Sequence, residues 1–123
     1  MAIQLNYPTL PLNVDTIIDG DDIKVANARV AKYKYKSIVG ALFSKAKINT
    51  IKERQVYSCK FEATKITVSA NGSLLIDGPY EDIDDYTEDD RFFYFFTKDN
   101  NYFCVEKTLC PPDFVDYIRT IFN

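Results

Sequence analysis

The stretch from Glu81 to Lys107 constrains the fold of this chain more than any other. It begins with seven acids within ten residues and continues, after Arg91, with five consecutive aromatic residues, 92–96. Turn-forming residues at 99–101 separate the aromatic run from a second run of strand formers, 102–107. The pattern predicts a β-hairpin whose aromatic strand is buried on both faces under a helix.

The size and composition of the chain predict a single domain over residues 1–123. With 123 residues, 46% of them hydrophobic, the chain can bury a core without disulfides or metal. Its cysteines, Cys59, Cys104 and Cys110, are odd in number and lack CxxC spacing, so neither a disulfide framework nor a zinc site is predicted. The N-terminus lacks a secretory signal pattern, and no segment approaches the ~20 apolar residues of a membrane span. We therefore expect a reduced, cytoplasmic setting.

Alternating apolar and polar residues predict the strands. The first is expected at Ile3–Tyr7, and two more at Val56–Glu62 and Lys65–Ser69. Asn71-Gly72 precedes another apolar run and supplies the two positive φ values of a type I′ hairpin turn. A further brief strand is expected at Asp84–Thr87, leading into the aromatic one.

Two segments have helical spacing. Apolar residues recur every three or four positions across 23–42 and favour a lysine-rich helix near the N-terminus. Within it, residues 32–36 alternate lysine with tyrosine, which is also typical of an edge strand guarded by lysines. At the C-terminus, prolines precede Asp113, and Phe114 and Ile118 share a wide apolar face, which predicts a helix that packs on the sheet.

These elements predict an α+β fold in which a bent antiparallel sheet is closed by the C-terminal helix. The strand run 61–68, Asn71-Gly72, the 79–83 turn, the hairpin 92–105 and the final helix together resemble the C-terminal domain of YcxB-like proteins. The resemblance covers residues 56–122. It implies a partial barrel of the pleckstrin-homology-like (PH-like) type. Family members usually carry a membrane hairpin ahead of this domain, where this chain has the lysine-rich segment 24–54, and the resemblance supplies no catalytic residues.

The residue types present argue against catalysis. The chain has no histidine, which removes the commonest general base and the commonest metal ligand. It has no nucleophile-elbow motif and no phosphate-cradling glycine loop. An EF-hand in the acidic run would need an oxygen ligand at Tyr86 and a glycine at Thr87. We expect no enzyme activity, no cofactor and no metal site.

Nucleic acid is also an unfavourable partner. The run 91–96 superficially resembles the aromatic strand of an RNA-recognition sheet, but it lacks the glycines of that motif. The seven acids directly before it would repel phosphate. We therefore predict no nucleic-acid binding.

The acidic run has two interpretations: a solvated loop, or a surface that steers a basic protein partner. On the second, the chain is a non-catalytic protein-binding domain, in concrete form a bacterial immunity or inhibitor protein that masks a basic toxin such as a nuclease. The predicted contact residues are seven acids and two nearby tyrosines: Glu81, Asp82, Asp84, Asp85, Glu88, Asp89, Asp90, Tyr80 and Tyr86.

The alternative function uses the basic segment 24–54 instead. It carries nine bases against one acid and suits an adaptor for anionic membrane surfaces or phosphoinositides. The residues expected to act are Lys32, Lys34, Lys36, Lys45 and Lys47.

Overall fold

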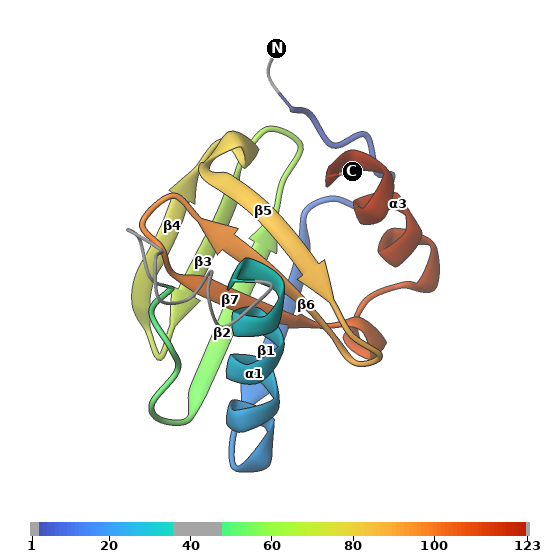
Figure 1. Ribbon diagram of the computed structural model, residues 1–123. Helices are drawn as coiled ribbons and strands as arrows, with labels where there is room; N and C mark the ends of the chain where they lie inside the picture. Colours follow the sequence, from blue (N-terminus) through green and yellow to red (C-terminus); the bar gives the residue numbers. More distant parts are fainter. Residues whose placement is uncertain (1–2, 36–47, 123) are drawn as a thin grey trace.

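The computed structural model describes residues 3–35 and 48–122, which form a mixed α+β fold with two antiparallel sheets that do not close on each other (Figure 1). The first sheet has the order β1-β2-β3-β4 and the second the order β5-β6-β7. The strands of the first sheet are β1 (Leu12–Ile18), β2 (Gln55–Phe61), β3 (Ile66–Ala70) and β4 (Ser73–Gly78). Those of the second are β5 (Ile83–Glu88), β6 (Phe92–Thr97) and β7 (Tyr102–Glu106). Helix α1 (Asp21–Tyr35) follows β1, and α3 (Pro112–Phe122) follows β7.

The first strand lies further along the chain than predicted. Ile3–Tyr7 is not a strand, although its Leu5 is buried and donates one backbone hydrogen bond to Ala63 O at 2.7 Å. The strand is Leu12–Ile18, which starts directly after Pro11 and pairs with β2 along its whole length. Both segments alternate, but only the second has a neighbouring strand to bond.

The predicted strands β2 and β3 and the hairpin that follows them are confirmed. Asn71 has a φ of 51° and Gly72 a φ of 81°, so both occupy the left-handed region that a type I′ turn requires. The Asn71 side chain also accepts from Val56 N at 2.8 Å and donates to Arg54 O at 2.9 Å. The turn is thereby tied to the start of β2.

The aromatic strand β6 is buried along its full length, as predicted. On one face, the Phe95 ring lies 5.3 Å from that of Phe103 and 5.6 Å from that of Phe122 in α3. On the other, Phe96 stacks on Tyr33 of α1, with the ring centroids 5.7 Å apart. Both helices therefore contact this strand, from opposite faces.

Helix α1 occupies residues 21–35, so most of the ambiguous segment 32–36 is helical, and the positions from 36 to 47 lie outside the described residues. Ala26 and Val30 are buried, in agreement with the predicted apolar stripe. Asn27 donates to Ile51 O at 2.8 Å and accepts from Ile51 N at 2.9 Å and from Tyr102 OH at 2.5 Å. These bonds attach the helix to β7 and to the segment before β2.

The predicted C-terminal helix is confirmed, and its apolar face is buried. Its Phe114 and Ile118 are each 1% exposed. The Phe114 ring lies 5.2 Å from that of Phe61 in β2 and 4.9 Å from that of Tyr7. In the described part of the chain, no helix is long and apolar enough to cross a membrane.

Candidate functional site

The acidic run is structured rather than looped. A 3₁₀ turn (Tyr80–Asp82) leads into β5, which carries Asp84, Asp85 and Glu88 and pairs with β6. Among the described residues, no strand pairs with its other side. Much of the acidic run therefore lies in β5, at the edge of the second sheet. Figure 1 shows β5 crossing the front of the molecule.

Glu88 lies at the centre of an ion cluster. Its carboxylate accepts from Lys107 Nζ at 2.5 Å and from Arg119 Nη2 at 2.7 Å and Nε at 3.0 Å. Lys107 also donates to the Asp89 carbonyl. The hydrogen bonds from Arg119 and Lys107 outweigh burial and lower the pKa of Glu88. The cluster joins β5 to the start of the 3₁₀ turn Lys107–Leu109 and to α3.

Asp89 closes the connection between β5 and β6. Its Oδ1 accepts from Arg91 N and Phe92 N, both at 2.8 Å, and its Oδ2 accepts from Tyr94 OH at 2.5 Å. Burial alone would raise the pKa of Asp89, but these hydrogen bonds outweigh burial and lower it. Asp89 therefore stabilises the fold and is not free to contact a partner.

Three further acids of the run have contacts within the chain. Asp85 accepts from Tyr33 OH at 2.9 Å and from the N–H of the next residue at 2.8 Å. Glu81 accepts from the backbone N–H of Ile3 at 3.3 Å. The Asp82 side chain lies directly against Gly78. A Cβ atom added to Gly78 would lie only 2.5 Å from the Oδ2 of Asp82.

Asp84 and Asp90 differ from these five acids. Both are exposed, and neither has a hydrogen-bond or ion-pair partner within residues 3–35 and 48–122. They lie at the two ends of β5, one near its start and one just beyond its end.

The two predicted aromatic contact residues have different environments. Tyr80 is fully buried and donates to Glu62 O at 2.6 Å, which leaves no ring surface for a partner. Tyr86 is half-buried on β5, and its ring centroid lies 6.0 Å from those of Phe93 and Phe95. Part of the Tyr86 ring therefore remains accessible.

The lysines of the alternative function are only partly described. Lys32 is exposed on α1, whereas the Lys34 ammonium lies over the Phe96 ring, 4.5 Å from its centroid. Lys36, Lys45 and Lys47 lie outside the described residues.

Two hollows lie along β5. One, of about 710 Å³, is lined from α1, from residues 88–92, from Lys107 and from Arg119. The other, of about 390 Å³, is lined by α1, by the consecutive residues 85–88 and by Phe122. Glu88 and Arg29 line both hollows, so these meet at the C-terminal end of β5.

Arg29 was not singled out by the sequence. Its guanidinium Nε is buried and has no hydrogen-bond partner in the described part of the chain. In the sequence it is one of nine bases in 24–54, and its position next to Val30 on the apolar stripe is the only feature that distinguishes it. A buried donor without an acceptor is uncommon in folded proteins and costs free energy.

The cysteine thiols and the acids do not form a reactive or metal-binding group in the described residues. All three cysteines are buried, and burial raises the pKa of each thiol, that of Cys110 to about 11. Within the same residues, no group of three or more cysteines and acids could hold a metal ion.

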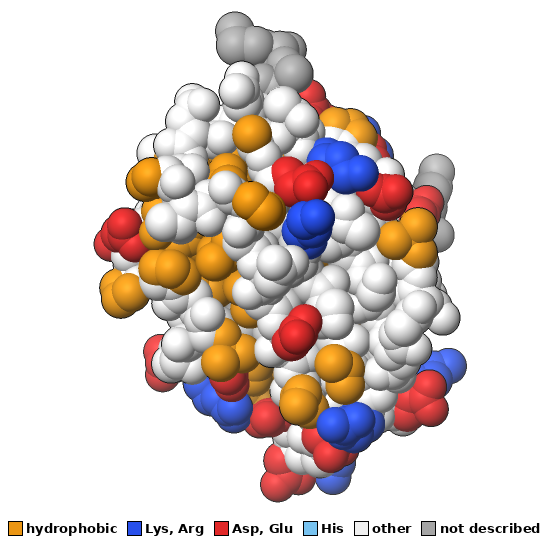
Figure 2. Space-filling model, turned by 180° about the vertical axis from the view of Figure 1, so that it is seen from behind, with side chains coloured by type: hydrophobic (Ala, Val, Ile, Leu, Met, Phe, Trp, Pro, Cys, Tyr) orange, Lys and Arg blue, Asp and Glu red, His pale blue; other side chains and the backbone are white. Residues whose placement is uncertain are grey.

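The side of the molecule opposite the view of Figure 1 carries interspersed charges. Figure 2 shows acidic and basic side chains mixed there, with no large patch of one sign. This face therefore offers no charged surface that competes with the acidic edge.

Comparison with known proteins gave no match: no family model, no curated protein and no solved structure matches the chain. The function must be inferred from the geometry and charge of its residues.

Proposed function

We propose that this chain is a non-catalytic protein-binding domain, and in concrete form a bacterial immunity or inhibitor protein that neutralises a basic toxin such as a nuclease. The observation that carries the proposal is that much of the acidic run lies in β5, an edge strand of the second sheet among the described residues, with one exposed carboxylate near its start and another just beyond its end. A hydrogen-bonded strand gives the backbone that carries these acids a defined position, which favours specific contact with a partner. Their charge would steer a basic protein onto this edge.

Asp84 and Asp90 are the principal contact residues in this proposal. The remaining acids of the run have contacts within the chain, and Asp89 and Glu88 in particular hold the connection after β5 and the α3 interface. Tyr86 is the accessible aromatic residue between Asp84 and Asp90. Neutralising either of the exposed acids would remove charge without removing an intramolecular bond.

We also propose that the two sheets and α3 form a PH-like partial barrel. Support comes from the order of elements, since a four-stranded antiparallel sheet is followed by a three-stranded one and a C-terminal helix. A cytoplasmic location is part of the same proposal, and it is supported by three buried free cysteines that form no disulfide.

Co-expression in bacteria tests the function. The chain is produced together with the basic C-terminal domain of the protein encoded immediately upstream of its gene, and growth is measured. We expect the chain to restore growth and the double variant Asp84→Asn/Asp90→Asn to restore it less. A control variant of equal charge, Glu53→Gln/Asp99→Asn, changes exposed acids outside the acidic run and should protect as the unchanged chain does. Growth arrest that persists while the folded chain is present would contradict the proposal.

Cosedimentation with vesicles tests the alternative function. Vesicles containing phosphatidylserine or a phosphoinositide are spun down with the chain, and the bound fraction is measured. Negligible binding is expected from an inhibitor with an acidic contact edge, because anionic lipid repels carboxylates. Strong, salt-sensitive binding would favour the membrane adaptor.

A further inference from the structure

A third hollow in the molecule shares no residue with the acidic run. It has a volume of about 350 Å³, near the lower end of the range of small-molecule pockets. Its lining comes from residues 49–53, from β2, from the β3–β4 hairpin and from residues 101–102 at the start of β7. Both sheets and the segment before β2 thus border a site that the proposed function does not use.

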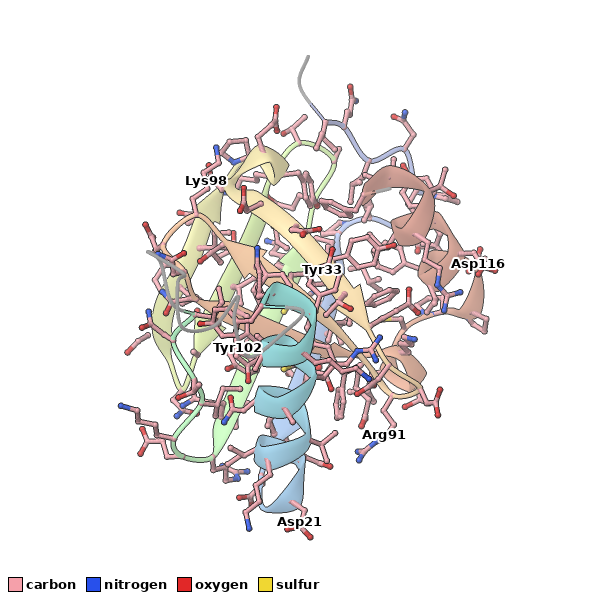
Figure 3. All side chains as sticks on the ribbon, in the orientation of Figure 1. Asp21, Tyr33, Arg91, Lys98, Tyr102 and Asp116 are labelled. Atoms are coloured by element: carbon pink, nitrogen blue, oxygen red, sulfur yellow. The ribbon has the colours of Figure 1, made fainter. Side chains whose placement is uncertain are left out.

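The walls of this hollow are held in place by hydrogen bonds. The Tyr102 hydroxyl donates to Asn27 Oδ1 at 2.5 Å, and Figure 3 shows Tyr102 beside α1. Asn27 also forms two bonds with the backbone of Ile51, another lining residue. Asn49 and Asn101, which line the hollow as well, are joined by a bond of 2.9 Å from Nδ2 to Oδ1. The hollow is therefore preformed, which lowers the entropy cost of binding.

Tyr57 supplies a polar group without a partner in this hollow. It is 3% exposed, yet its hydroxyl makes no hydrogen bond within the described residues. In the same residues, the fully enclosed side-chain atoms that lack a partner are Arg29 Nε and Glu81 Oε1, so the Tyr57 hydroxyl keeps some accessible surface. Because Tyr57 lines the hollow, that surface opens into it. Buried tyrosine hydroxyls usually have a hydrogen-bond partner, and a bound molecule would supply one here.

The lining determines the class of molecule that fits. The rings of Tyr57 and Tyr102 and the side chain of Leu75 supply apolar contacts. The charged residues of the lining, a lysine at 52 and a glutamate at 53, are both exposed and opposite in sign. Burial raises the pKa of Tyr57, so its hydroxyl is protonated at neutral pH and can donate. These surroundings favour an uncharged aromatic molecule with an acceptor oxygen, because an ionised group buried without a counter-ion is costly.

We propose that this hollow binds a small, uncharged aromatic molecule whose hydroxyl or carbonyl oxygen accepts a hydrogen bond from Tyr57. The site is additional to the proposed protein-binding function and uses none of the residues 80–90.

Nuclear magnetic resonance with three probes tests the proposal. Benzamide, acetophenone and 4-methylphenol each carry one ring and one acceptor oxygen; they are titrated into the full chain, and the shifts of its amide and methyl groups are followed. We expect at least one probe to cause saturable shifts at Ile51, Leu75 and Tyr102, with an affinity in the millimolar range. Benzoate has the shape of benzamide but carries a charge, and it should bind more weakly than the uncharged probes that bind. The absence of saturable shifts at these residues with all three probes would overturn the proposal, and so would equally tight binding of benzoate.

Tyrosine variants test the role of the hydroxyl. Tyr57→Phe removes an oxygen that has no partner within the described chain, so its thermal unfolding should match that of the unchanged chain. It should weaken binding of the tightest probe about fivefold, the loss expected for one neutral hydrogen bond. Tyr7→Phe removes a hydroxyl that bonds Asp113 outside the hollow and should leave the affinity within about twofold. Equal affinities of the two variants, or a strong loss of stability in Tyr57→Phe, would contradict a hydroxyl that is free to bind a ligand.

Discussion

Glu88 and Asp90 are two residues apart in the same acidic run, yet their environments differ completely. Glu88 is held by Lys107 and Arg119, whereas Asp90 is exposed and has no partner in the described part of the chain. A run of like charges can therefore contain both residues that stabilise the fold and residues that are free to contact a partner. Substitutions of single residues can separate these two roles.

Glu88→Gln should lower the free energy of unfolding at pH 7 by about 1.5–3 kcal/mol, because it weakens charge-assisted hydrogen bonds at a partly buried carboxylate. Since the pKa of Glu88 is lowered in the folded state, the stabilisation is complete above the ordinary value of 4.5 and is lost as the pH falls through the lowered pKa. The difference between the two proteins in urea unfolding should thus shrink between pH 7 and pH 3. A difference that is the same at both pH values would show that the ion cluster does not cause it.

Asp89→Ala should cost about 1–2 kcal/mol of stability, because two backbone N–H groups and the Tyr94 hydroxyl lose their acceptor. Asp90→Ala is the matched control and should stay within about 0.5 kcal/mol of the unchanged chain. Thermal and urea unfolding of the two variants measure this difference. Equal losses would mean that Asp89 does not close the connection from β5 to β6.

At the scale of elements, local signals in the sequence were sufficient for some parts of the fold. Asn71-Gly72 predicted its hairpin because two adjacent residues determine that turn. The aromatic run predicted β6, since few positions other than a strand covered on both faces bury six consecutive residues. The first strand was misplaced because two alternating segments compete near the N-terminus, and only pairing with β2 distinguishes them.

The candidate site depends on contacts that the sequence does not display. Arg119 binds Glu88 from 31 residues away, and Tyr33 binds Asp85 from 52 residues away. Residue type and spacing singled out the acids as a group but carried no information on which of them are paired. For the same reason, nothing in the sequence indicated that Arg29 lies where two hollows meet.

Helix α3 should depend strongly on its buried face. Ile118→Ala removes most of a side chain that is 1% exposed and should lower the free energy of unfolding by about 2–5 kcal/mol. Thr120→Ala on the exposed side of the same helix should change it by less than about 0.5 kcal/mol. Urea unfolding followed by circular dichroism measures both. A small effect of Ile118→Ala would mean that α3 does not close the core.

At the scale of the molecule, one hydrophobic core joins both sheets, α1 and α3, and the acidic edge lies on its outside. Core residues come from all seven strands of the described chain and from α1 and α3. Because β6 and α3 fix the position of β5, the backbone that carries Asp84 and leads to Asp90 has a defined position before any partner arrives. Such preorganisation reduces the entropy that binding would otherwise cost.

The central claim is that exposed acids on the β5 edge bring a basic protein onto this chain. The most direct test is the association rate constant between the chain and the basic domain encoded upstream, measured by stopped flow at low and at moderate ionic strength. For Asp84→Asn/Asp90→Asn, the rate constant at low salt should fall about tenfold relative to the unchanged chain. The difference between the two rate constants should become smaller as salt screens the charges. The control Glu53→Gln/Asp99→Asn should associate at nearly the rate of the unchanged chain. Equal rate constants for the unchanged chain and the β5 variant at low salt would contradict the claim.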